Sequence, residues 1–353
     1  MLRLPFLNPF LFFSLLLLIW NHSQTVSGQQ TTRENAVYYR RRRSRKEMPL
    51  YSTLPLFQSS RHEKKKESGL TPSPKLAFRF LYHDTSTAEN APQWMRTQYI
   101  KSGYRAYLRK SQIICSLFSL HNETLNIWTH LIGAVLFVKE LWGLSVASEY
   151  RLRQPSELYC MQLFTVAAFC CFFFSTTYHL FNCHSEKVCC SLLQLDLSGI
   201  AILISGSFLA GVALGFKCSP FLKGLYLSFT GIICVSSLFA ANCLKAERHH
   251  TLKVGIFVGA VVFGLVPAVH WFLLVPREVT GIFMVPLGMM FFYYGLGFCF
   301  WKYKIPERFL PGKFDIFFHS HQFWHVLVFL AAWEMYRGLL RYWQYISNAN
   351  DLC

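Results

Sequence analysis

The chain has 353 residues, of which 53% are hydrophobic, 17% aromatic and only 15% charged. Soluble proteins carry about 25% charged residues, so this composition favours a polytopic membrane protein over a soluble one. The net charge of +17 is concentrated near the N-terminus, because 19 of the 35 Lys and Arg residues precede residue 111. This basic excess comes with no zinc-finger spacing and no aromatic and basic motif, so it does not indicate nucleic-acid binding.

The twelve cysteines are spread along the chain, and several lie inside apolar runs. Buried free cysteines behave as small hydrophobic residues, so we interpret Cys170, Cys171, Cys234 and Cys299 in this way. Their spacing predicts no disulfide framework.

An apolar run over residues 4–20 lies within the N-terminal segment 1–28. We expect an uncleaved signal anchor, because the basic residues 40–46 that follow favour a cytosolic position. The alternative is a cleaved signal peptide with small residues at Val26-Ser27-Gly28, which would invert the orientation of everything downstream. A start at Met48 would remove the run altogether.

The next two segments differ in composition. Residues 29–90 are polar and basic without apolar periodicity, so we expect a disordered juxtamembrane tail. Its charge orients the chain, and binding to anionic lipid is the alternative role. Residues 91–123 contain aromatic residues such as Trp94 and Tyr107 among basic ones. This mixture predicts an ordered interfacial segment with aromatic rings at headgroup depth.

Seven apolar segments follow, and each is long enough as a helix to cross roughly 30 Å of hydrocarbon. Short, proline-containing connections separate them, so no soluble domain is left over. We therefore predict an all-α membrane protein, a seven-transmembrane-helix bundle over residues 124–341 with a short C-terminal tail at 342–353. The predicted spans are 124–146, 158–180, 192–214, 223–244, 252–274, 279–301 and 318–341.

Lys and Arg residues are distributed unevenly between the two sides of this bundle. The links and span edges on the side of the N-terminal tail contain 12 of them, against 7 on the opposite side. Because cytosolic loops carry the excess of positive charge, we predict an inverted topology with the N-terminus inside and the C-terminus outside. The chain is expected to be a multi-pass protein of the plasma membrane or an endomembrane.

Polar residues from three separate spans converge in this topology. His179 lies at the cytosolic end of the second span, and Asp196 lies one turn inside the third. His321 and His325 open the seventh span at positions i and i+4, which share one helix face. Ionisable groups at membrane depth are costly and are usually functional. The agreement in depth predicts a single buried site.

Three neutral imidazoles that leave a fourth position for water are typical of catalytic zinc, so His179, His321 and His325 are the candidate ligands. Asp196 is the candidate base or holder of the water, and Ser175 lies one turn before His179 on the same face. The alternative is that these polar side chains only form hydrogen bonds between neighbouring helices. His130 is expected to be packed and hydrogen-bonded, and His270 to be structural. His184 lies in a loop, and we expect it to be solvated or to contact the ligands from behind.

Six motifs occur in one order along the chain, and together they are specific for one family. They are Ser116-Leu-Phe-Ser-Leu-His-Asn122-Glu-Thr-Leu-Asn126-Ile-Trp-Thr-His130, Tyr178-His179, Cys183-His-Ser-Glu186, Leu195-Asp-Leu-Ser-Gly-Ile200, Ile305-Pro-Glu-Arg-Phe-Leu-Pro-Gly-Lys-Phe-Asp315 and Ser320-His-Gln-Phe-Trp-His325. Over roughly residues 95–345 the chain resembles the progestin and adipoQ receptor family, and within it the adiponectin receptors and plant heptahelical proteins.

The resemblance implies a seven-helix fold with a cytosolic N-terminus and zinc held by the three histidines. It also implies that Asp196 positions a water molecule. The family is similar to alkaline ceramidases, which implies a place for Ser175 at the site. Asn122, Glu123 and Asn126 match the first-helix motif, and we assign them to helix packing or to the cytosolic mouth. The Asn122-Glu-Thr sequon would face the cytosol and remain without a glycan.

Two functions are compatible with this reading. The first is a zinc-dependent amidohydrolase acting on a lipid amide such as ceramide, coupled to hormone, lipid or stress signalling. The second is a receptor whose zinc is purely structural and whose extracellular ligand, still unknown, shifts helix packing. The expected partners are membrane lipids, that ligand and a second copy of the chain. A channel is disfavoured because charged residues do not recur at mid-membrane depth. A G-protein-coupled receptor is disfavoured by the charge bias.

Overall fold

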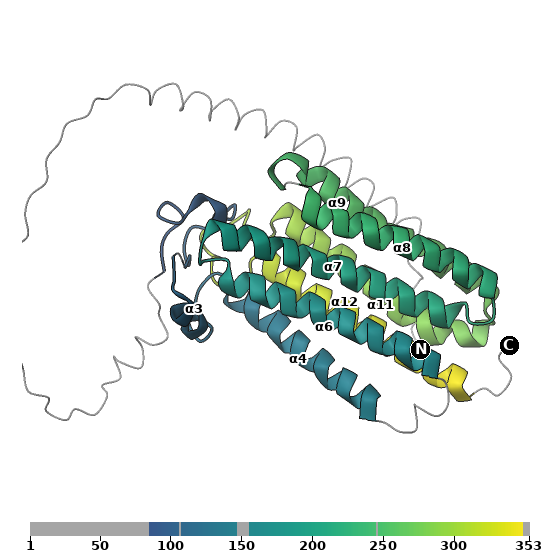
Figure 1. The fold of residues 1–353 in the computed structure, drawn as a ribbon. Helices are drawn as coiled ribbons and strands as arrows, with labels where there is room; N and C mark the ends of the chain where they lie inside the picture. The colour runs from purple at the N-terminus through teal and green to yellow at the C-terminus, as the bar shows by residue number, and fades with distance from the viewer. Residues whose placement is uncertain (1–84, 106, 147–154, 245, 349–353) are drawn as a thin grey trace, which may run out of the picture. The chain divides into compact units, whose positions relative to one another are not determined.

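The computed structural model describes residues 85–105, 107–146, 155–244 and 246–348, all within the compact unit Pro72–Cys353 (Figure 1). The expectations for residues 1–28, for residues 29–84 and for the end of the C-terminal tail therefore lie outside the described residues.

The described residues form helices and no strand, apart from one isolated bridge between Ser86 and Tyr104. Each predicted span is occupied by helical structure, which confirms the all-α class. The elements are η1 (Gln93–Met95), α3 (Lys110–Ser116), α4 (Thr124–Val146), α6 (Pro155–Phe181), α7 (Glu186–Gly215), α8 (Pro220–Cys243), α9 (Ala246–Phe263), α10 (Leu265–Leu274), α11 (Arg277–Tyr303) and α12 (Ser320–Asn348).

Six helical stretches among the described residues are long and apolar enough to cross a membrane. They are Thr124–Val146, Ser156–Phe181, Glu186–Gly215, Pro220–Cys243, His249–Leu274 and Arg277–Tyr303. The seventh predicted span, α12, is a 29-residue helix. It is less apolar because it begins with Ser320, His321 and Gln322 and contains Glu334 and Arg337. It contacts α4, α6, α7 and α11, so much of its surface faces protein (Figure 1).

The fifth predicted span, 252–274, is not one continuous helix. It consists of α9 and α10, which are separated at Gly264. Pro267 lacks a backbone N–H, so the carbonyl of Phe263 has no i+4 donor and the helical ladder is interrupted there. A Cβ atom on Gly264 would lie 2.9 Å from the Phe208 ring of α7, so glycine also permits this close approach.

Close packing between α6 and α7 places the polar residues of both helices side by side. An added Cβ would lie 2.9 Å from the Cα atom of Cys171 at Gly199, and 2.6 Å from the Cβ of Ala167 at Gly206. Small residues at such positions let membrane helices approach closely. Because Gly199 is less than one turn from Asp196, this contact fixes the third predicted span against the second near the candidate site.

One cysteine differs from the expectation drawn from the sequence. Cys218, in the link between α7 and α8, is disulfide-bonded. The other ten cysteines of the described residues are free thiols. A disulfide framework is predicted from several cysteines at regular spacing, and one bonded cysteine in a link provides no such pattern.

Two connecting segments cover the end of the bundle where α12 begins. Asp315, in the α11–α12 loop, accepts hydrogen bonds from the backbone N–H of Lys101 (3.1 Å) and from the hydroxyl of Ser102 (2.7 Å). Tyr104 is fully buried, and its hydroxyl donates to the carbonyl of Ile100 at 3.1 Å. The segment before α3 is thus an ordered layer that is hydrogen-bonded to the α11–α12 loop.

Candidate metal centre

Three imidazoles from two helices face one another at this end of the bundle. His179 lies in the last turn of α6, and His321 and His325 lie in the first turns of α12. One potential ligand atom from each lies within 4.8 Å of the others, the one such group of three among the described residues. The Nε2 atom of His321 is 3.3 Å from Nε2 of His179 and 3.2 Å from Nε2 of His325. Two nitrogens bound to one tetrahedral zinc ion would lie about 3.3 Å apart.

The hydrogen bonds of the opposite ring nitrogens determine which tautomers are present. Nδ1 of His179 is 2.8 Å from Oε2 of Glu123, and Nδ1 of His325 is 3.0 Å from the carbonyl oxygen of Asn126. A carboxylate and a carbonyl only accept, so each Nδ1 carries the proton and each Nε2 presents a lone pair. Both lone pairs face Nε2 of His321. This one nitrogen carries at most one proton, so it cannot donate to both. A cation shared by the three nitrogens satisfies all of them, and the donor set fits zinc.

Glu123 is the centre of the hydrogen-bond network behind His179. Its carboxylate accepts from Asn126 Nδ2 at 2.6 Å and from Asn182 Nδ2 at 3.1 Å, besides its contact with His179. Burial raises the pKa of Glu123, but its contact with His179 and the hydrogen bond from Asn126 outweigh burial and hold the pKa well below its usual value. The sequence motif predicts a role for Glu123 in helix packing or at the cytosolic mouth, and does not predict this contact with His179. The signal was a carboxylate placed directly before the first span.

His130 packs against the site without belonging to the ligand group. Its ring stacks on that of His325 with centroids 3.8 Å apart and an angle of 15° between the planes. Its Nε2 atom is 3.3 Å from the carbonyl oxygen of His325. This agrees with the expectation of a packed, hydrogen-bonded residue. The stack restricts the rotation of the His325 ring.

Asp196 and Ser175 lie beside the histidines and outside the ligand group. The Asp196 carboxyl interacts with the Ser175 hydroxyl and, electrostatically, with His179 and Glu123. Ser175 is almost completely buried, with 2% of its surface exposed. Asp196, the predicted base or holder of the water, and Ser175, predicted to lie at the same site, are therefore neighbours on facing sides of the α6–α7 contact.

The two other histidines considered from the sequence lie elsewhere. His184 lies in the link between α6 and α7, and its Nδ1 atom is 3.0 Å from the carbonyl oxygen of Leu108. His270 of α10 is hydrogen-bonded to the hydroxyl of Tyr226 at 2.7 Å. Neither belongs to the ligand group.

Backbone contacts hold both ligand-bearing helices in place. The guanidinium of Arg105 is buried and donates to the carbonyl of His179 (2.8 Å) and to the hydroxyl of Ser116 (2.7 Å). At the start of α12, the Glu307 carboxylate accepts from the backbone N–H of Ser320 at 2.7 Å and also from the Ser320 hydroxyl. The first contact caps a carbonyl at the end of α6, and the second caps the N-terminus of α12.

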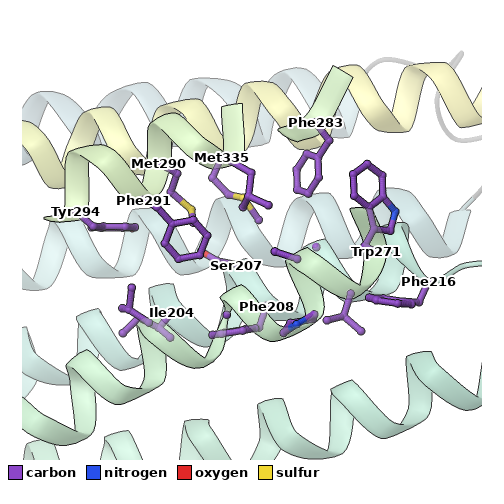
Figure 2. Close-up of a pocket in the computed structure, with 17 residues that line it drawn as sticks. Ile204, Ser207, Phe208, Phe216, Trp271, Phe283, Met290, Phe291, Tyr294 and Met335 are labelled. Carbon is purple, nitrogen blue, oxygen red and sulfur yellow. The ribbon is translucent and has the colours of Figure 1, made fainter. Parts of the chain in front are cut away.

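An apolar cavity of ≈ 80 Å³ lies between α7, α9, α10, α11 and α12. Figure 2 shows Phe208, Trp271 and Phe291 among the side chains that surround it. Tyr294 also lines it and interacts with Cys171, which in turn interacts with Asp196. These two electrostatic interactions connect one lining residue to Asp196 only indirectly, and the apolar lining of the cavity suits an apolar chain.

Comparison with known proteins shows what the chain is similar to. Residues 118–336 match the haemolysin-III-related family. The chain is 33% identical over 267 residues to the adiponectin receptor protein of Drosophila melanogaster, which covers 71% of this chain and 58% of the relative. It is 34% identical over 260 residues to progestin and adipoQ receptor family member 3 of Mus musculus (70% and 82%). It is 31% identical over 335 residues to heptahelical transmembrane protein 4 of Arabidopsis thaliana (71% and 86%).

The extent of the match differs between relatives. The match spans only 58% of the fly protein and 59% of progestin and adipoQ receptor-like protein 1 of Caenorhabditis elegans. Together with the six membrane-length helices, these relatives confirm the prediction of a multi-pass integral membrane protein.

Proposed function

This chain belongs to the haemolysin-III-related family, the group of the progestin and adipoQ receptors, and on that premise we propose that it is a zinc-containing seven-helix membrane receptor that hydrolyses lipid amides. The observation that carries the proposal is the convergence of Nε2 atoms from His179, His321 and His325. The tautomers of His179 and His325, fixed by their Nδ1 partners, support a shared cation at this point.

The residues around the histidines suit hydrolysis of an acyl amide. Zinc, when bound, supplies a Lewis acid that polarises the acyl carbonyl. In this proposal Asp196 takes a proton from the attacking water, and the interaction of its carboxyl with the Ser175 hydroxyl supports that role. Water adds to the acyl carbon, the C–N bond breaks, and the proton held at Asp196 passes to the leaving amine nitrogen. The apolar lining of the cavity suits part of an acyl chain, which favours a lipid amide such as ceramide as substrate.

We infer that α12 is the seventh membrane span and that the α12 N-terminus faces the cytosol. The length of α12 and its contacts with four other helices support the first point. The excess of Lys and Arg on the side of the α11–α12 loop supports the second. Cys218, which is disulfide-bonded, lies in the α7–α8 link, at the end of the bundle opposite to the α12 N-terminus. Disulfides persist in oxidising compartments. This agrees with an exterior position of the α7–α8 link.

A purely structural zinc is the second candidate function. It is favoured by one observation, that the three ligands join α6 to α12, two helices far apart in sequence. A ligand outside could then signal by shifting this joint without any turnover. The choice between the two functions requires an activity measurement.

The test is release of fatty acid from ceramide by the purified, detergent-solubilised chain, detected by mass spectrometry. We expect zinc-dependent release that is abolished in Asp196→Asn while the bound zinc is retained, because Asp196 lies outside the ligand group. His179→Ala should lose both zinc and release. Stoichiometric zinc without release would contradict the hydrolase and favour the structural role. Full release in Asp196→Asn would remove the proposed base.

A further inference from the structure

Four basic side chains from two helices gather at one end of the bundle, outside the histidine site. His250 and Lys253 lie in the first two turns of α9, Lys302 lies in the last turn of α11, and Lys304 is the C-cap of α11. All three lysines interact electrostatically with His250, and Lys302 interacts with Lys304. The four groups therefore lie within reach of a single bound molecule.

The ring of Trp301 organises this cluster. The Nζ atom of Lys304 lies 5.2 Å from the Trp301 ring centroid, a cation–π distance. The His250 ring is stacked with the same indole, with centroids 6.3 Å apart and 21° between the planes. Lys304 has a left-handed backbone (φ 55°), and its N–H is bonded to the carbonyl of Phe300. This reversal of the chain brings Lys304 back over the indole and fixes the geometry.

The described side chains offset only part of the positive charge of the cluster. No ion pair joins Lys253, Lys302 or Lys304 to a carboxylate among them. Glu307 acts on Lys304 at longer range, but its two oxygens are engaged by Ser320.

Two of the lysines are also withdrawn from water. Lys253 is 7% exposed and donates to the carbonyl of Ala241 at 3.2 Å. Burial lowers the pKa of Lys304, and Lys302 lowers it further against the opposing effect of Glu307. A partly buried cation without a counter-ion is costly, so this cluster favours a bound anion.

The depth of the cluster indicates what kind of anion it is. The candidate spans that carry these residues begin at His249 and end at Tyr303, so the cluster lies where hydrocarbon gives way to lipid headgroups. Leu252, beside Lys253, is 53% exposed and is placed to contact an acyl chain. Tryptophan and lysine are also common general anchors at this depth, but a general anchor does not require four convergent groups.

We propose that His250, Lys253, Lys302 and Lys304, arranged around Trp301, bind the phosphate headgroup of an anionic phospholipid in the leaflet at this end of the bundle. The lysines provide the charge, and the Lys253 contact with the α8 terminus and the Trp301 contact with Lys304 hold it in position. The cluster contains none of the three histidine ligands, although Lys304 acts electrostatically on His321, and none of its residues belongs to the basic segment 29–90.

The test compares lipids on the full chain in nanodiscs by native mass spectrometry. The probes are phosphatidylinositol bisphosphate and phosphatidylcholine. The variant combines Lys302→Gln and Lys304→Gln. The matched control is Lys313→Gln, which changes an exposed lysine of the α11–α12 loop that follows. We expect retention of the anionic lipid by the unaltered chain, a loss of roughly tenfold or more in the double variant, and little change in the control.

Three results would overturn the proposal. Equal retention of both lipids would show that no anionic site exists. An equal loss in Lys313→Gln would show diffuse attraction to positive charge in place of a site. Displacement of the lipid by free inositol trisphosphate at equal concentration would show that the site takes a soluble phosphate. Should the double variant fail to fold, the single Lys302→Gln variant tests the same prediction, and Lys302→Arg should restore retention.

Discussion

His179 is held at three points, so its ring is positioned independently of a metal. Nδ1 contacts Glu123, Nε2 faces the imidazole of His321, and the backbone carbonyl accepts from Arg105. A carboxylate bound to the far nitrogen of a metal-ligating histidine fixes its tautomer and raises its basicity. Glu123 is therefore expected to act on the metal through His179.

Glu123→Gln tests this role. The amide keeps the size of the side chain but removes the negative charge, so zinc affinity should fall by about ten- to a hundredfold. Competition with a chelating dye measures this affinity, and the helical signal in circular dichroism checks the fold. Glu334→Gln is the matched control, because among the residues that the structure describes Glu334 forms its ion pair with Arg337, away from the histidines. Unchanged affinity in Glu123→Gln would contradict the assignment.

The histidines were predictable from the sequence, whereas Glu123 was not. His321 and His325 share a helix face by spacing alone, and the depth of His179 follows from the end of its span. Glu123 precedes its span by one residue, where an acid is commonly a favourable helix N-terminal charge. Its contact with His179 joins residues 56 apart, and only the packing of α4 against α6 creates that contact.

The packing of α6 against α7 brings Asp196 close to the histidines. Gly199→Ala would place a methyl group 2.9 Å from the Cα atom of Cys171, and backbone cannot move aside as a side chain can. We expect a loss of about 1–3 kcal/mol, less the gain in helix propensity.

A shift in the thermal unfolding midpoint of the detergent-solubilised chain measures this loss. The control is Gly231→Ala, because a Cβ at Gly231 meets nothing within 4 Å. That change should be neutral or stabilising. Equal midpoints in the two variants would refute a close contact at Gly199.

Element boundaries show what hydropathy predicts and what it does not. The first span, 124–146, coincides with α4. The other predicted spans begin and end, in most cases, within a few residues of their helices. The break between α9 and α10 could not be predicted from apolar length, because the apolar stretch continues across Gly264 from one helix into the other. The polar residues of the site itself lower the mean hydropathy of α12. Hydropathy alone therefore does not identify this helix as a membrane span.

The orientation of the whole molecule connects the charge bias with the disulfide at Cys218. If the α12 N-terminus is cytosolic, a cysteine introduced as Lys313→Cys should react with an impermeant maleimide only after the cells are permeabilised. A cysteine introduced as Arg277→Cys, at the opposite end of α11, should react in intact cells. Both substitutions are made in a chain whose exposed free cysteines are replaced by serine. The reverse pattern of labelling would refute the inverted topology.

The central claim is a zinc ion held by His179, His321 and His325, and the most direct test is elemental analysis of the purified full chain. We expect about one zinc per chain in protein prepared without chelators. His321→Ala should bind zinc about tenfold or more weakly, while the chain still inserts and keeps its helical signal. His184→Ala is the control, because His184 bonds the carbonyl of Leu108 outside the ligand group. A chain without zinc, or zinc binding that is unchanged in His321→Ala, would contradict the account.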